Sequence, residues 1–222
     1  MTYSSLIKSA CCLLATTAIS TAATSYTATV ASLDGAPEDD IAFFANGSPI
    51  PVNTGSIAIG YFDDGFDPQS ATSPSQLISS FNFFSNDNQP YQFSFLNGFD
   101  SPGFFDGSNT ATIDSTGINA DFIGKPVTVL IGEGSTLATS TLFAALSSTT
   151  SQFADNNQLN SGSSSIFSDT SSNLLLGIDD GATTVEGFPA DSVRLVAVIP
   201  EPSSTGILVA VALAGITYRR RA

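Results

Sequence analysis

The amino-acid sequence predicts an all-β fold, with an antiparallel β-sandwich or jelly-roll-like domain over residues 24–199. The middle of the chain consists of short apolar, β-prone segments separated by Gly, Pro, Asn and Asp, and their spacing is typical of antiparallel sandwiches. Phe81 and Phe83 alternate along one segment, as do Phe93 and Phe95 along another, so each pair can point to one buried face. The middle of the sequence contains no long, clean helical stripe.

The predicted strands follow these apolar segments in order. They are expected at residues 26–33, 56–61, 77–84, 91–96, 110–113, 127–131, 140–146, 174–178 and 192–199. Residues 136–146 are the most ambiguous between helix and strand. Two polar segments are expected to be loops: residues 36–53, which hold three prolines and an acidic run, and residues 147–172, which are rich in Ser, Thr, Asn and Gln.

Residues 1–23 have the pattern of a secretory signal peptide. Lys8 provides the positive charge, residues 10–19 form the short apolar stretch, and small residues acceptable to a signal peptidase follow. The alternative, a buried helix, is disfavoured by the β-prone sequence that comes next. Cys11 and Cys12 lie inside this segment without a lipobox, so the processed chain would have neither a thiol nor a disulfide.

The chain is strongly acidic, with 20 Asp and Glu against 6 Lys and Arg and a formal net charge of −14. Between the two ends, Lys125 and Arg194 are the only basic residues. Such a surface repels phosphate backbones, so we expect no nucleic-acid partner. The 17 Phe and the clusters of Ile, Val and Leu nevertheless provide enough apolar area for a folded core.

The sharpest motif lies near residue 200. Pro200-Glu201-Pro202 is followed by an apolar run over residues 206–218 and then by Arg219, Arg220 and Arg221. The prolines prevent the continuation of a helix or strand, and the run predicts a transmembrane helix at about residues 204–218. The positive-inside rule places the arginine cluster of residues 219–222 in the cytoplasm. A core helix with a basic C-cap is the alternative.

This order of Pro-Glu-Pro, short apolar segment and terminal arginines resembles the PEP-CTERM sorting signal, over residues 200–222 only. The resemblance implies that the chain is a substrate of an exosortase, an intramembrane cysteine protease of Gram-negative bacteria that also make exopolysaccharide. It implies a location in the cell envelope, at the surface or in the extracellular matrix, with at least transient insertion in the inner membrane. It implies no activity for the domain upstream, and a plain, uncleaved anchor remains the competing interpretation.

The residue types exclude several classes of chemistry. The chain has no His, which excludes a Ser-His-Asp triad and His-metal sites, and the loss of both Cys would exclude thiolate chemistry. A glycosidase needs only two carboxylates, but the chain has no Trp to serve as a flat sugar platform. We therefore expect no catalytic residues.

Calcium is the one cofactor that the sequence leaves open, because hard cations take Asp and Asn oxygens presented by loops. The weak candidates are Asp63, Asp64, Asp67, Asp100 and Asp106, followed by Asn109, Asp179 and Asp180. Turn formation and solubilising charge are the favoured explanation of these residues, ahead of calcium binding.

The sequence thus predicts an exported, cell-surface or exopolysaccharide-associated protein without enzymatic activity. Its expected partners are signal peptidase, an exosortase and the membrane. A carbohydrate- or calcium-binding surface module, with extracellular polysaccharide as a partner, is the first alternative, and a carboxylate-based glycan hydrolase is the second.

Overall fold

The computed structural model describes residues 25–32, 40–84, 92–93, 102–113, 117, 119–154, 163–168, 170–185 and 188–198. The signal segment 1–23 and the sorting segment 200–222 lie outside this part of the chain. Within it, strands dominate and α1 (Pro74–Ser79) is the single α-helix, which confirms the all-β expectation. No helix of the described residues is long and apolar enough to cross a membrane.

The strands form three sheets. A three-stranded sheet has the order β10 (Ser163–Ile166), β1 (Ser25–Ala31), β7 (Asp106–Thr112). The central sheet has the order β11 (Ser172–Leu176), β9 (Leu142–Gln152), β8 (Pro126–Gly132), β4 (Ser56–Phe62), β5 (Phe81–Phe83), with β14 (Val196–Ala197) on β9 and β6 (Gln92–Phe93) on β4. A four-stranded sheet has the order β12 (Ile178–Val185), β13 (Phe188–Arg194), β2 (Ile41–Ala45), β3 (Ser48–Pro49).

The central sheet is buried on both faces. Ile57 and Ile59 of β4 belong to the main hydrophobic cluster, whereas Ala58 between them belongs to a second cluster. Strand β8 divides in the same way, because Val129 joins the main cluster and Leu130 the second. Opposite faces of one strand therefore serve two cores, which explains why these segments read as continuous apolar runs.

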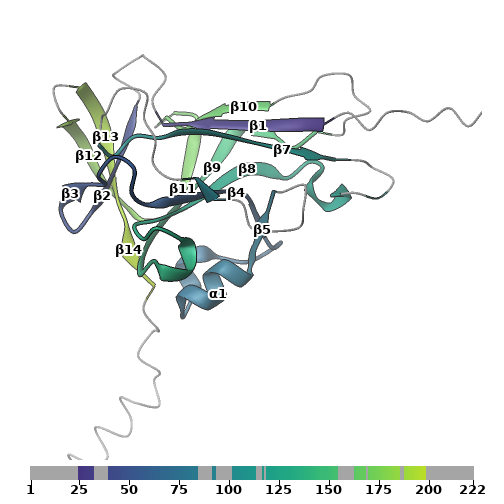
Figure 1. Ribbon diagram of the computed structural model, residues 1–222, viewed down its shortest axis with the longest axis horizontal. Coiled ribbons are helices and arrows are strands. Elements are labelled where there is room, and N and C mark those ends of the chain that lie inside the picture. Colours follow the sequence, from purple (N-terminus) through teal and green to yellow (C-terminus); the bar gives the residue numbers. More distant parts are fainter. Residues whose placement is uncertain are drawn as a thin grey trace, which may run out of the picture.

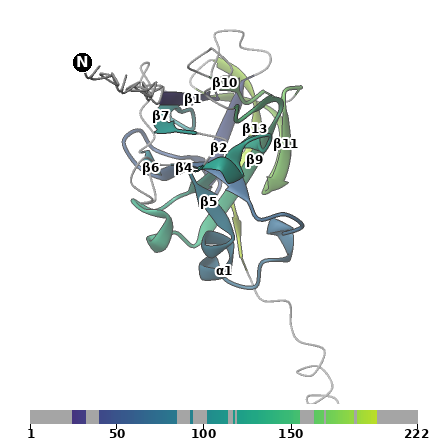
Figure 2. The ribbon, with the colours of Figure 1, turned by 90° about the vertical axis from the view of Figure 1, so that its right-hand side faces the viewer.

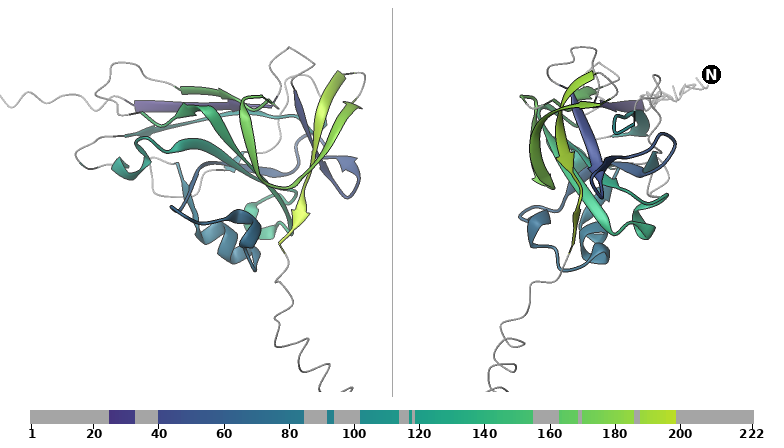
Figure 3. Two further views of the ribbon diagram at one scale, coloured as in Figure 1. Left: turned by 180° about the vertical axis from the view of Figure 1, so that it is seen from behind. Right: turned by 90° about the vertical axis from the view of Figure 1, so that its left-hand side faces the viewer.

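Different elements cover the two faces. The main cluster includes the inward residues of β1 and β7, and Figure 1 shows these strands above β8 and β9. The second cluster includes Ala71, which follows the η1 turn (Pro68–Ser70), Leu77 of α1 and Leu137 of the η3 turn (Leu137–Thr139). Figures 1 and 2 place α1 beneath the sheet. The four-stranded sheet lies beside this assembly, with β13 next to β2 in the view from behind (Figure 3).

The antiparallel expectation is wrong for two strand pairs. Strand β1 pairs in parallel with β10, and β2 pairs in parallel with β13. Both pairs join segments far apart in the sequence, so no hairpin turn sets their direction. In these parallel registers Val30 and Val193 lie in the main cluster.

The expected strand at residues 77–84 is wrong in its first half. The chain forms α1 there, and β5 follows. Ser73 caps the helix by accepting a hydrogen bond from the Gln76 amide at 3.2 Å, and Pro74 occupies the first turn. This Ser-Pro start signal outweighed the apolar Leu77 and Ile78. In the second half, Phe81 and Phe83 do share one face, with ring centroids 5.2 Å apart.

Both segments expected to be loops contain strands. Strands β2 and β3 form a hairpin around Asn46 and Gly47, whose φ angles of 55° and 81° are those of a tight two-residue turn. The polar half of β9 and all of β10 lie within residues 147–172. Ser147 is buried there and shares a 3.3 Å hydrogen bond with Thr128, so a hydroxyl-rich strand can lie in the sheet interior. The expected strand at residues 174–178 corresponds to β11, and β12 lies almost wholly outside the predicted strands.

Candidate functional site

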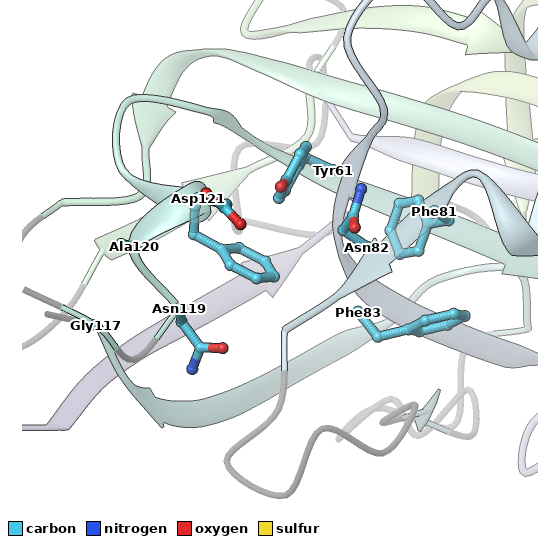
Figure 4. Close-up of a pocket in the computed structure, with 9 residues that line it drawn as sticks. Tyr61, Phe81, Asn82, Phe83, Gly117, Asn119, Ala120 and Asp121 are labelled. Carbon is cyan, nitrogen blue, oxygen red and sulfur yellow. The ribbon is translucent and has the colours of Figure 1, made fainter. Parts of the chain in front are cut away.

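A pocket of about 490 Å³ opens where the end of β4, β5 and the η2 turn (Ala120–Phe122) meet. It is lined by Tyr61, Phe81, Asn82, Phe83, Gly117, Asn119, Ala120, Asp121 and Phe122. Figure 4 shows Asn119 and Asp121 on one side, Asn82 and Phe83 on the other, and Tyr61 between them. The lining therefore combines aromatic rings with a hydroxyl, two amides and a carboxylate.

A packed aromatic cluster forms the base of the pocket. The Tyr61 and Phe122 rings meet edge to face with centroids 4.9 Å apart. Phe122 also lies 5.4 Å from Phe84 and 5.1 Å from Phe153, both fully buried. Rings locked together in this way form a rigid floor, because any one of them can move only if its neighbours move.

Strand β5 forms one wall because it approaches β4 very closely. Gly60 pairs with Phe83, and a Cβ atom on Gly60 would lie 2.0 Å from the Asn82 carbonyl oxygen. Glycine is thus required for this pairing. Alternation along β5 then directs Phe81 and Phe83 into the second cluster and Asn82 to the opposite face, and all three residues line the pocket.

Both amides of the pocket are held by the protein. Asn82 donates from Nδ2 to Asp63 Oδ1 at 2.8 Å. Asn119, in the left-handed conformation with φ 54°, donates from Nδ2 to the Thr112 carbonyl at 2.7 Å. Each bond fixes one amide plane, and each amide has a second N–H and a carbonyl oxygen as further hydrogen-bonding groups. The orientation of both groups is set before any ligand arrives.

The electrostatics of the pocket keep Tyr61 protonated. Burial raises the pKa of the Tyr61 hydroxyl, and the neighbouring Asp121 carboxylate raises it further, because both disfavour a phenolate. Lys125 lowers the pKa of Tyr61, because its ammonium lies 5.5 Å from the Tyr61 ring centroid. This ammonium is also bound to the Asp64 carboxylate, at 2.5 and 2.6 Å from its two oxygens. Tyr61 therefore provides an O–H donor at neutral pH.

No family model, curated protein or solved structure matches this chain. The chemistry of the site follows from its own residues. These are one hydroxyl, two oriented amides and one exposed carboxylate above an aromatic floor, a set that can bind a polar ligand through several hydrogen bonds.

The acidic residues singled out in the sequence are engaged in local contacts. Asp63 accepts from Asn82, Asp64 pairs with Lys125, and Asp67 caps η1 by accepting from the Gln69 amide at 2.9 Å. Asp179 accepts from the Gly181 amide at 2.8 Å, and Asp180 forms a two-point ion pair with Arg194. In the described part of the chain, no group of three or more His, Cys, Asp or Glu is placed to hold a metal ion.

The remaining predicted residues are dispersed or lie elsewhere. Asp106 is exposed at the start of β7, away from the loop that holds Asp63, Asp64 and Asp67. Asp100 and the side chain of Asn109 are outside the described residues, as are Pro200, Glu201 and Pro202 and the arginines at 219, 220 and 221.

Sequence reasoning missed Asn82, Asn119 and Asp121 as pocket residues. One signal was available, because a single Asn between two phenylalanines on a strand must face away from both. Asn119 and Asp121 gave no such signal, since their position depends on how η2 packs against Tyr61.

Proposed function

We propose that this chain is an exported protein of the cell surface or its exopolysaccharide, without enzymatic activity, and that residues 200–222 sort it. The observation that carries the proposal is the order of Pro200-Glu201-Pro202, the apolar run 206–218 and the arginine cluster 219–221 directly after the last strand. Signal peptidase and an exosortase of a Gram-negative host would process the two ends, and the apolar run would at least transiently span the inner membrane.

The position of the last strand supports processing near residue 200. Strand β14 pairs with β9, and Val198 packs against the second hydrophobic cluster. Cleavage near Pro200 would leave both contacts intact, so the β domain would keep its fold after release from the tail. The domain would also sit directly at the membrane before cleavage, without a stalk.

The architecture proposed for this domain is a sandwich-like arrangement. The main hydrophobic cluster joins inward residues of β1 and β7 to those of β4, β8 and β9, as expected for two sheets packed face to face. Among the described residues that line the pocket, Asp121 is the one carboxylate. Glycosidases act with two.

Intact mass and N-terminal sequencing of the protein from native cells test the sorting proposal. Wild type should begin near residue 23 or 24 and lack the arginine tail, whereas the triple variant Pro200→Ala, Glu201→Ala, Pro202→Ala should retain it. Pro51→Ala, a change at an exposed proline of the domain, is the control and should be processed as wild type. A wild-type mass that includes residues 206–222 would refute cleavage and leave a plain membrane anchor.

A further inference from the structure

The polar groups of the pocket between β5 and η2 include both donors and acceptors, and they converge on one space. The Tyr61 hydroxyl can donate or accept, the Asp121 carboxylate accepts, and the amides of Asn82 and Asn119 do both. A ligand that satisfies all of them must itself carry several groups that donate and accept. Hydroxyl groups on adjacent carbon atoms have this property, whereas an apolar ligand would leave the groups unpaired.

The surrounding charge selects against anions. Asp121 lines the pocket, and Asp63 and Asp64 lie just beyond Tyr61 in the loop after β4. Lys125 is the nearby cation, and Asp64 already occupies its ammonium. Three carboxylates around one paired ammonium give the pocket a negative potential, and the chain as a whole carries a net charge of −14. Phosphorylated, sulfated or uronic-acid ligands would therefore be repelled.

The pocket is also organised before a ligand binds. Its floor is the packed cluster around Phe122, and hydrogen bonds to Asp63 and Thr112 hold its two amides. Its volume of about 490 Å³ is within the range of small-ligand sites in proteins. A site that does not have to be ordered on binding gives usable affinity from few contacts.

We propose that this pocket binds an uncharged, polyhydroxylated ligand, namely sugar units of a neutral polysaccharide. Asp121 accepts hydrogen bonds from sugar hydroxyls, Asn82 and Asn119 fix the orientation of the sugar ring, and the Tyr61 and Phe122 rings contact its C–H groups. The inference concerns the β domain and does not depend on whether residues 200–222 are cleaved.

Binding is measured with the full chain in a polyoxyethylene detergent, because detergents with sugar headgroups would compete. The probes are immobilised dextran, barley β-glucan and galactomannan as neutral polysaccharides, and alginate and hyaluronate as anionic ones. We expect saturable binding to at least one neutral polysaccharide, unaffected by EDTA, and none to the anionic ones.

Two pocket variants and one matched control connect binding to the site. Asp121→Ala and Asn82→Ala should each weaken binding about tenfold, as expected for the loss of one strong hydrogen bond. Asp106→Ala removes an equally exposed carboxylate outside the pocket and should bind as wild type. Circular dichroism checks that all three variants keep the β fold.

Four results would overturn the proposal. One is the absence of binding to every neutral polysaccharide, and another is binding that Asp121→Ala and Asn82→Ala leave unchanged. The third is binding that EDTA abolishes, which would indicate a bridging metal ion instead of direct contacts. Preference for alginate or hyaluronate would contradict the charge argument in the same way.

Discussion

Replacement of Phe84 by alanine should destabilise the fold by about 3 to 5 kcal/mol. Phe84 is fully buried, and its ring centroid lies 5.8 Å from Tyr26, 5.4 Å from Phe122 and 4.9 Å from Phe153. Transfer of the side chain from water accounts for roughly 1.5 to 3 kcal/mol. The rest arises from the cavity, because the three neighbouring rings belong to different segments and cannot close around the missing ring together.

Urea unfolding followed by circular dichroism measures this cost. The matched control is Phe66→Ala, because Phe66 is only partly buried and its ring contact is Phe62 at 5.6 Å. We expect about 1 kcal/mol for the control. Phe84→Leu, which keeps most of the volume, should cost less than about 1.5 kcal/mol and remains measurable if the alanine variant does not fold. Equal losses for Phe84→Ala and Phe66→Ala would refute the packing argument.

Two further predictions concern the wall and the electrostatics of the pocket. Gly60→Ala should cost about 1 to 3 kcal/mol in urea unfolding, because the new Cβ would lie 2.0 Å from the Asn82 carbonyl oxygen. Gly117→Ala is the control, and it should change stability by less than about 0.5 kcal/mol because no atom lies within 4 Å of its Cβ position. Similar costs for the two variants would contradict the close approach of β4 and β5. Tyr61 should ionise above pH 10 in titrations of tyrosinate absorbance, with Tyr61→Phe identifying its signal, and Asp121→Asn should lower its pKa, unlike Asp106→Asn. Because the folded-state pKa of Tyr61 is raised, Tyr61 leaves the stability of the fold unchanged below pH 10 and reduces it as the pH rises through the folded-state pKa. A Tyr61 that titrates at or below pH 10 would contradict this environment.

Local patterns predicted the strands that form the centre of the sheet. Residues 56–61 and 127–131 are apolar runs bounded by Gly or Pro, and they become β4 and β8. The prediction was wrong where two signals competed. Leu77 is apolar like a strand residue, yet Ser73 and Pro74 start a helix. The prolines around β2 similarly obscured the Asn46-Gly47 hairpin.

The candidate site shows more clearly what local sequence patterns do not predict. Tyr61, Asn82 and Asp121 lie on three segments, each with an ordinary local sequence. What brings them together is the packing of η2 on Tyr61 through Phe122 and the pairing of β5 with β4 at Gly60. Neither contact leaves a periodic signal in the chain. The acidic loops, in contrast, attracted attention as possible calcium ligands, and their described carboxylates contact nearby amides and cations.

The sequence by itself determined the all-β class, because short apolar segments interrupted by turn residues cannot form long helices. Its lack of His and Trp also removed several kinds of site before any fold was known. Tertiary structure alone decided which strands pair, including the parallel partners Ala28 and Ser163, and which polar side chains share a pocket. The physical reason is that strand pairing and pocket formation depend on burying both faces of each strand at once. The free energy of that burial comes from contacts between segments that are distant in the sequence.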